Sequence, residues 1–164
     1  MASNDYEFVT EWRVEAPREL IYDILVDGED LPRWWPDVYL EARKEPSPDG
    51  GEVGTRVHLH TRGWLPYTLR WTAETVRVDR PAGFEIRATG DFDGRGVWTL
   101  VQEGLVTYAR FDWRLKANKP ILAALSFALK PLFAWNHRWA MERGYESLRR
   151  VVARRAAAHA SSVA

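Results

Sequence analysis

The spacing of apolar residues near the start of the chain has a period of two. Within residues 6–15, Phe8, Thr10, Trp12 and Val14 fall on one face, and charged residues occupy most of the other. Alternation of this kind is typical of a strand with one face against a core and one face in water. The sequence therefore predicts a half-buried first strand.

Two short helices are predicted after this strand. In "APRELIYDILVD", Pro17 suits a first helical turn, where its missing N–H has no cost, and apolar residues recur at helical spacing from Leu20 to Leu25. In "EDLPRWWP", Asp30 can cap a second helix and Pro36 follows its end. The chain should thus leave the first strand through a compact helical connection.

Residues 38–116 return to period two and are interrupted by turn signals. In one strand, for example, Tyr67, Leu69 and Trp71 alternate with polar residues. This pattern predicts six antiparallel strands with a charged outer face and an aromatic inner face. The turn signals lie at residues 47–51, 63–66, 79–83, 90–96 and 103–104.

Residues 118–158 have helical character. Pro120 fits the first turn, Pro131 should kink or restart the helix, and the tail after Ala156 should fray. Only this element is long enough to cover one apolar sheet face. We therefore predict an α+β fold in which a curved seven-stranded antiparallel sheet wraps around a long C-terminal helix. Residues 1–164 should form a single domain, ordered over about 5–156.

Composition removes several classes of function. Lys plus Arg and Asp plus Glu number 23 each, so the net charge favours neither nucleic acid nor acidic membranes. The chain has no cysteine, which excludes disulfides and thiol nucleophiles. It has no signal-like start and no run of about 20 apolar residues for a membrane span. We expect a soluble, cytoplasmic protein.

The stretch "FAWNHRWAM" is the main candidate for chemistry. On a helical wheel, His137 lies near the middle of the apolar face with Phe133 and Met141. It should point at the sheet, where two interpretations stay open. The imidazole either bonds to a sheet residue as part of the core or contacts a ligand in a cavity.

Trp135 and Trp139 fall toward the charged side of the same wheel. They either pack against the short helices, near Trp34 and Trp35, or form a contact with a dimer partner or a membrane surface. The nine tryptophans of the chain, unusual for its length, make aromatic walls a general expectation.

Other motifs favour ordinary structural roles. His58 and His60 share a strand face, but no third ligand is apparent nearby, so a hydrogen-bonded or solvated pair is preferred to a metal site. "GDFDGRG" lacks the spacing of a calcium loop and is interpreted as a tight turn. No phosphate loop, dinucleotide fingerprint or nucleophile elbow is present. We expect no metal and no cofactor.

The order of elements resembles the START-like helix-grip (SRPBCC) superfamily, and most closely its bacterial polyketide cyclase/dehydrase-type members. The likeness spans about residues 5–155. It is carried by "FVTEWRVEAPRELIYDILVDGEDLPRWWPDV", the long meander and the last helix. The resemblance implies a deep apolar cavity between sheet and helix. Members bind lipids, sterols, polyketides, hormones or aromatic compounds, and some catalyse cyclisation or dehydration, so the fold alone leaves the function open.

The first hypothesis is a binding module for a hydrophobic, aromatic, lipid-like or polyketide-like small molecule. His137, with Asn136 or Tyr67, would orient the ligand. Trp98 is assigned to the wall, although the phase of its strand also permits Val97. The predicted lining is Trp12, Tyr67, Leu69, Trp71, Phe84, Trp98, Phe111, Trp113, Asn136, His137, Met141 and Leu148.

The second hypothesis is a metal-free cyclase or dehydratase. His137 would remove a proton next to a carbonyl, and Tyr67, Tyr108 or Arg110 would stabilise the enolate oxygen. The third is an interaction module that uses exposed tryptophans to meet a protein, a membrane surface or a second copy of the chain. No nucleic-acid partner is expected.

Overall fold

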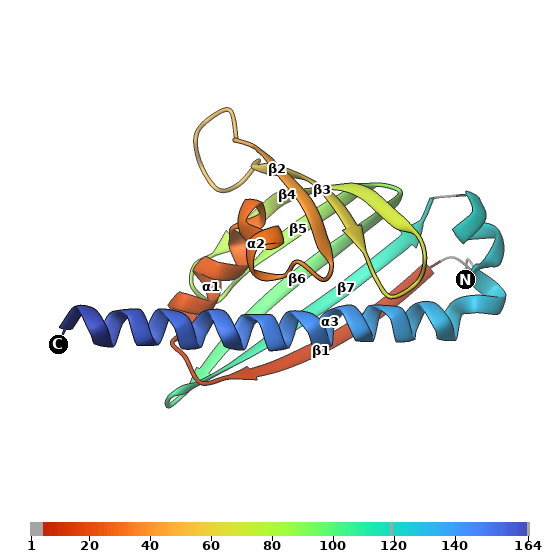
Figure 1. Cartoon of the computed structure of the whole chain (residues 1–164). Helices are drawn as coiled ribbons and strands as arrows, with labels where there is room; N and C mark the ends of the chain where they lie inside the picture. Colours follow the sequence, from red (N-terminus) through yellow and green to blue (C-terminus); the bar gives the residue numbers. More distant parts are fainter. Residues whose placement is uncertain (1–4, 119, 164) are drawn as a thin grey trace.

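The computed structural model describes residues 5–118 and 120–163, and seven of its strands form one antiparallel sheet. The strand order is β1-β7-β6-β5-β4-β3-β2, so the first two strands of the chain lie at opposite edges (Figure 1). The strands are β1 (Asp5–Val14), β2 (Tyr39–Glu45), β3 (Arg56–Arg62), β4 (Thr68–Asp79), β5 (Gly83–Gly90), β6 (Phe92–Glu103) and β7 (Val106–Ala117).

Short helices connect the two edge strands. They are α1 (Arg18–Val26), the 3-10 turn η1 (Gly28–Asp30) and α2 (Leu31–Trp34). The predicted pair of short helices is thereby confirmed. Because β1 and β2 occupy opposite edges, this connection crosses the sheet and places buried residues of α1 and α2 over its inner face.

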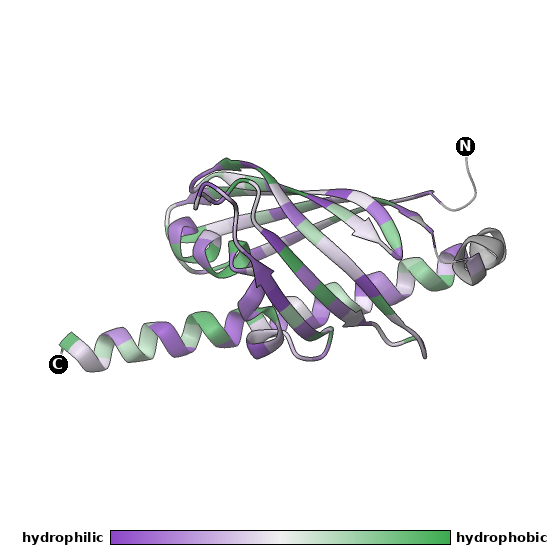
Figure 2. Cartoon of the chain, turned by 90° about the horizontal axis from the view of Figure 1, so that it is seen from above, coloured by the Kyte–Doolittle hydropathy of each residue, from purple (hydrophilic) through white to green (hydrophobic). Residues whose placement is uncertain are grey.

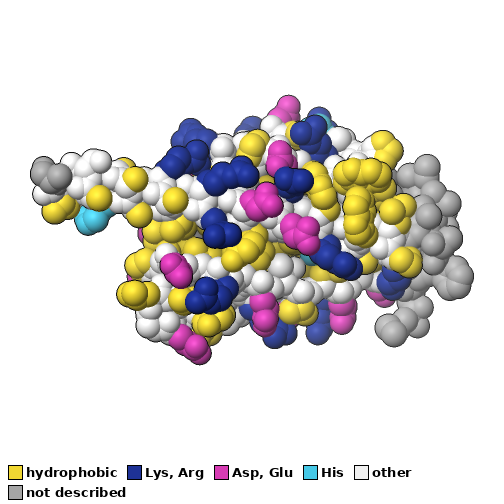
Figure 3. Space-filling view, turned by 60° about the horizontal axis from the view of Figure 1, so that its bottom comes forward, with side chains coloured by type: hydrophobic (Ala, Val, Ile, Leu, Met, Phe, Trp, Pro, Cys, Tyr) yellow, Lys and Arg dark blue, Asp and Glu magenta, His cyan; other side chains and the backbone are white. Residues whose placement is uncertain are grey.

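The long helix α3 (Pro120–Val163) runs along the sheet and extends beyond it at its C-terminal end (Figures 1 and 2). In Figure 3 this end projects from the body as an arm. The predicted helix-grip arrangement is confirmed. The helix continues past Ala156, where fraying is expected from the sequence, to Val163. Three of the seven residues from 157 to 163 are alanine, the strongest helix former, which favours a helical backbone there.

Pro131 lies inside α3 and does not interrupt its assignment. Its effect is a change of direction, since the early, cyan part of the helix turns away from the axis of the rest (Figure 1). A proline within a helix removes one backbone hydrogen bond and bends the axis. The expected kink is present, and the helix does not restart.

The expected turn at residues 90–96 is shorter than predicted. β6 begins at Phe92, so "DGRG" belongs to a strand. Gly96 has a packing role there, because a Cβ at this position would come within 2.9 Å of the rings of Phe111 and Trp113. Gly96, which resembles a turn residue in the sequence, therefore makes room for aromatic side chains on the neighbouring strand β7.

The backbone of α3 comes close to the segment that follows α2 at Gly144. A Cβ built on Gly144 would collide with the six-membered ring of Trp35, which is itself buried. Only glycine lets the backbone of α3 lie directly against this indole. This contact brings α3 against the segment that follows α2.

We expect Gly144→Ala to lower the free energy of unfolding by about 1–3 kcal/mol, the usual cost of overpacking. The direction of this change is informative, because replacing glycine by alanine inside a helix otherwise stabilises the helix by about 1 kcal/mol. In a Trp35→Leu background the clash is absent, and the same substitution should stabilise the protein. Urea denaturation of the four proteins in this cycle measures both values. An equal effect of Gly144→Ala in both backgrounds would contradict the contact.

Candidate functional site

A cavity of about 240 Å³ lies among the inner sheet face, the short helices and α3. Ten of the twelve predicted lining residues border it. These are Tyr67, Leu69, Trp71, Phe84, Trp98, Phe111, Trp113, Asn136, His137 and Met141. Sequence reasoning missed several others, including Tyr6, Phe8, Trp35, Tyr39 and Phe133. The β1 alternation could have indicated Phe8, since it places this residue on the same strand face as Trp12.

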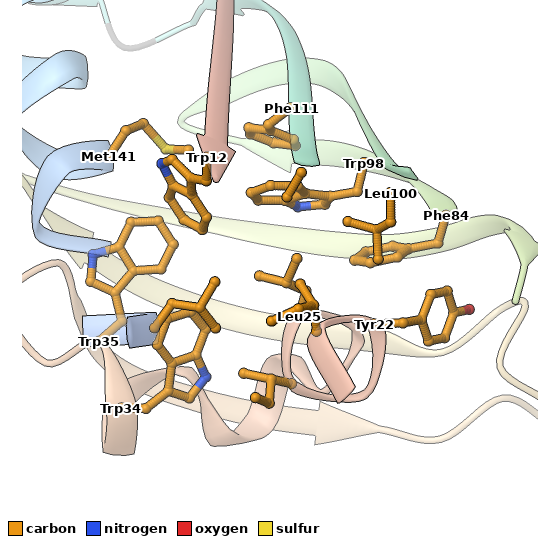
Figure 4. Close-up of a cluster of buried hydrophobic side chains, with 14 of the residues drawn as sticks. Trp12, Tyr22, Leu25, Trp34, Trp35, Phe84, Trp98, Leu100, Phe111 and Met141 are labelled. Carbon is orange, nitrogen blue, oxygen red and sulfur yellow. The ribbon is translucent and has the colours of Figure 1, made fainter. Parts of the chain in front are cut away.

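Aromatic rings on neighbouring strands form one wall of the cavity. Trp98 stacks on Phe111 with centroids 4.6 Å apart, and Phe111 stacks on Trp113 at 5.4 Å. Trp71 continues the wall at 5.8 Å from Trp113. Figure 4 shows Trp98 and Phe111 close together, with Trp12 and Met141 beside them. Such a surface offers flat, apolar contact area to a ligand.

His137 points from α3 toward β1. Its ring stacks on Phe8 with centroids 4.2 Å apart and planes at 19°. Nε2 is buried, and no hydrogen-bond partner for it lies among the described residues. Burial lowers the pKa of His137 to about 4, so the imidazole is neutral near pH 7. One interpretation from the sequence was a hydrogen bond from the imidazole to a sheet residue. Nε2 makes no such bond among the described residues, and the sheet instead places the ring of Phe8 against the imidazole.

Tyrosines lie at the same end of the cavity as His137. Phe133, one turn before His137 on α3, contacts Tyr6 at 6.0 Å and Tyr67 at 6.3 Å between ring centroids. Burial raises the pKa of Tyr67 to about 12, and nearby Tyr6 contributes to the rise. Tyr67 therefore keeps its proton and can donate a hydrogen bond. His137 and Tyr67 therefore give this end of the cavity polar side chains that are themselves uncharged near pH 7.

Asn136 borders the cavity, but its side-chain oxygen already has partners. Oδ1 accepts hydrogen bonds from the backbone N–H groups of Trp64, at 2.7 Å, and Leu65, at 3.1 Å. Both donors belong to the connection between β3 and β4. The side-chain carbonyl of Asn136 is therefore occupied by the protein backbone. If this side chain orients a ligand, it does so through its amide nitrogen.

Two predicted lining residues lie in solid core. Trp12 packs between Trp98, at 5.1 Å, and Trp35, at 5.8 Å. Leu148 is fully buried and does not border the cavity. Both face the sheet-to-helix interior as expected. They lie where α3 packs tightly against the rest of the protein. The sequence therefore assigned both side chains to the correct face of their elements, but they do not line the cavity.

Arg110 and Tyr108 do not reach the cavity. Arg110 lies on the outer face of the sheet, where it donates to Asp112 at 3.0 Å and pairs with Glu11 at 3.7 Å. Tyr108 is 41% exposed. The alternation along β7 places both side chains on the face of the sheet that does not carry Phe111. They therefore cannot stabilise an enolate oxygen inside the cavity.

The four tryptophans that the sequence suggested for an interaction surface, Trp34, Trp35, Trp135 and Trp139, divide into two groups. Trp34 and Trp35 are buried with the short helices. Trp135 does not pack on those helices. It meets Trp64 edge to face at 4.9 Å, and the two side chains are 40% and 59% exposed. Of the tryptophans that the sequence suggested for an interaction surface, only Trp135 and the half-buried Trp139 remain accessible, and Trp64 joins them through its contact with Trp135.

No trio of His, Cys, Asp or Glu within the described residues is arranged to hold a metal ion. His58 instead bonds to Thr72 at 2.9 Å and to Glu45 at 2.8 Å. In the same part of the chain, no helix is long and apolar enough to cross a membrane.

A family model described as "Polyketide cyclase / dehydrase and lipid transport" matches residues 6–153. The chain belongs to this family. The resemblance inferred from the order of elements is therefore confirmed. Among curated protein sequences, none matches the chain.

Solved structures of this family's type share the fold at low sequence identity. The Zhui aromatase/cyclase from Streptomyces sp. R1128 has a TM-score of 0.74 at 14% identity, covering 93% of this chain and 96% of that one. A START superfamily protein from Mycobacterium smegmatis gives 0.70 at 17%, covering 90% and 97%. The protein TTHA0849 from Thermus thermophilus gives 0.68 at 21%, covering 87% and 96%. At these identities the likeness shows the fold alone.

The buried imidazole predicts a specific pH dependence of stability. The ordinary pKa of 6.5 applies to the unfolded chain, and the folded value is about 4. Between these values the unfolded state binds a proton that the folded state does not, so stability falls as the pH drops from 6.5 to 4. The loss should reach roughly 3 kcal/mol.

Urea denaturation at several pH values between about 7.5 and 4 tests this expectation. His137→Gln removes the titrating group, so wild type should lose about 2–3 kcal/mol more than this variant over the range. Acidic residues elsewhere affect both proteins equally. Parallel profiles for the two proteins would contradict the lowered pKa, because they would mean that His137 takes up a proton equally readily in the folded and unfolded states.

Proposed function

We propose that this protein binds a neutral, mainly aromatic small molecule in the cavity, with a hydroxyl or carbonyl group directed at His137. Two observations on one residue carry the proposal: His137 borders an aromatic cavity, and its buried Nε2 has no hydrogen-bond partner among the described residues. A buried polar atom without a partner costs free energy. A ligand that supplies the missing hydrogen bond recovers that energy.

The size and lining of the cavity support a compact ligand. Small-molecule sites usually span about 300–1,000 Å³ and combine apolar walls with a few placed polar groups. The volume here, about 240 Å³, lies just below that range. A molecule of two or three fused rings suits it better than a long acyl chain. The stacked wall of Trp98, Phe111 and Trp113 favours a flat ring system.

The charge of the lining supports a neutral ligand. Of the described residues that border the cavity, Arg62 is the one with a permanent charge, and it is exposed with Nε bound to the carbonyl of Asp37 at 3.2 Å. His137 and Tyr67 are uncharged near pH 7. A buried carboxylate or ammonium on the ligand would find no counter-charge inside.

A pair of matched probes tests the role of His137. We expect 2-naphthol to bind wild type about five- to tenfold more tightly than it binds His137→Phe, the value of one hydrogen bond. Naphthalene lacks the hydroxyl and should bind both proteins within about twofold. Naphthyl fluorescence follows the titrations, and His159→Phe, on the exposed end of α3, is the control. An equal loss for both probes would contradict a hydrogen bond to His137.

A second candidate function is cyclisation or dehydration of a carbonyl compound. The observation in its favour is that His137 and the protonated Tyr67 border the same cavity and both lie close to Phe133. The Nε2 atom of His137 has no hydrogen-bond partner among the described residues. Its weakness is basicity. A general base works best with a pKa near the working pH, and that of His137 is about 4. We therefore place binding first.

Deuterium exchange separates the two functions. A catalytic His137 would accelerate exchange of the protons next to the carbonyl of 2-tetralone in D₂O, and His137→Phe would lose that acceleration. We expect equal exchange rates for the two proteins, because a neutral imidazole of low pKa is a weak base. Nuclear magnetic resonance follows the exchange. A rate at least about tenfold higher with wild type would establish catalysis instead.

A further inference from the structure

The end of α3 that projects from the body forms a basic arm, residues 153–163. Every residue of the arm is exposed, and the arm extends past the sheet into solvent (Figures 1 and 3). Four of the 23 basic residues of the chain lie after Glu146, and none of the 23 acidic residues does. The four are Arg149, Arg150, Arg154 and Arg155. An exposed helix with one sign of charge favours a partner of the opposite sign.

Two arginines of the arm are available to another molecule. Arg150, just before the arm, pairs with Glu146 at 3.7 Å, one helical turn earlier. Arg154 and Arg155 have no ion pair among the described residues. Most other residues of 153–163 are alanine or serine, so the arm has few other groups that recognise a partner. Charge is therefore the main property that the arm presents.

Charges of the opposite sign lie on α1 of the same chain. The range 15–30 contains six acidic residues and one basic residue, Arg18. Glu19 and Asp23 in α1, and Asp27 directly after it, recur every four residues and are exposed. Residues at this spacing share one face of a helix, and the opposite face of α1 is buried. The outer face of α1 is thus an acidic row.

Ion pairs within the chain neutralise only part of this row. Asp23 accepts a hydrogen bond from Arg80, and Glu19 lies 4.0 Å from Arg18. Asp27 has no ion pair in the part of the chain that the structure describes. Even with Arg80 counted, the acidic residues of this region outnumber the basic ones by four. The row therefore retains a negative charge that a basic helix can balance.

The geometry of the chain points to a second copy as the partner. The arm leads away from the body at the end where its own α1 lies (Figure 1). When two copies are related by a two-fold axis, the arm of each can lie along α1 of the other, so both contacts form together. At about 1.5 Å per residue, the arm spans about 16 Å and the nine residues of α1 about 14 Å. Because the whole chain has equal numbers of acidic and basic residues, net charge does not oppose this association.

We propose that the basic arm binds the acidic row of α1 in a second copy of the chain, which gives a reciprocal dimer. Arg154 and Arg155 of one copy face Glu19 and Asp27 of the other. Exposed ion pairs are individually weak and are screened by salt, so the dimer exchanges with the monomer and dissociates as ionic strength rises. This surface lies outside the cavity, so the inference does not depend on the proposed binding function.

Sedimentation velocity at about 20 and 300 mM salt tests the dimer. Wild type at roughly 100 µM should be mainly dimeric at the lower salt, and its association should weaken at least about tenfold at the higher salt. Arg154→Glu with Arg155→Glu reverses the arm, and Glu19→Lys with Asp27→Lys reverses the row. Each of these double variants alone should sediment as a monomer.

A mixture of the two double variants identifies the contact. One protein then has an acidic arm and an acidic row, and the other has a basic arm and a basic row. Their equimolar mixture should form a heterodimer at the lower salt, because both reciprocal contacts are restored. The matched control is Arg43→Glu with Lys44→Glu, which reverses two exposed positive charges on β2, away from the arm, and should dimerise as wild type does.

Several results would overturn this dimer. Wild type that remains monomeric at the lower salt would do so, as would a mixture that forms no heterodimer. An equal loss of association in the control and the arm variant would reduce the effect to net charge. Monomeric wild type that binds vesicles of anionic lipid through Arg154 and Arg155 would assign the arm to a membrane surface instead.

Discussion

The contact between Trp35 and Gly144 determines where α3 can touch the rest of the protein. The indole lies against the helix backbone, and no larger side chain fits there. On the C-terminal side of this point the helix packs solidly, with Leu148, Val151 and Val152 buried. On the N-terminal side its inward residues border the cavity instead. The cavity thus follows from a helix pressed close at one point and held away from a curved sheet elsewhere.

Neutrality of the interior is a second consequence of this arrangement. The outer face of the sheet carries cross-strand ion pairs, such as Arg87 with Glu74 and Arg114 with Glu7, which remain in contact with water. The inner face has aromatic residues at the alternate positions. Placing a charge there would require a buried partner, and the alternation supplies none. Among the polar residues that do enter, burial lowers the pKa of His137 to about 4, so its imidazole is neutral near pH 7, and burial raises the pKa of Tyr67 further above its already high ordinary value.

Much of this arrangement could be predicted from the sequence. The alternation of apolar and polar residues along the strands predicted that Trp71, Trp98 and Phe111 lie on the inner face. The helical spacing of apolar residues predicted that His137 points at the sheet. A periodic pattern identifies a face but not the depth of packing along it, so Trp12 and Leu148 were assigned to a cavity they do not reach.

Contacts between distant segments were beyond prediction for a different reason. Asn136 meets Trp64, 72 residues earlier in the chain, and no local rule connects the two. The same holds for Trp35 and Gly144. In "GDFDGRG" the glycines suggested a turn. Gly96 lies in strand β6 instead, where it packs beside Phe111 and Trp113. Local sequence therefore determined the elements, and long-range contacts determined the site.

Membership of the polyketide cyclase/dehydrase and lipid transport family leaves both binding and catalysis open, so the choice depends on the chemistry of this cavity. Catalysis by proton removal needs a base whose pKa lies near 7, which calls for water or a carboxylate beside the imidazole. His137 has an aromatic ring, Phe8, against its face instead. The environment that makes its buried nitrogen a good partner for a ligand hydroxyl also makes it a poor base. A single physical cause, burial against aromatic rings, thus favours recognition over turnover.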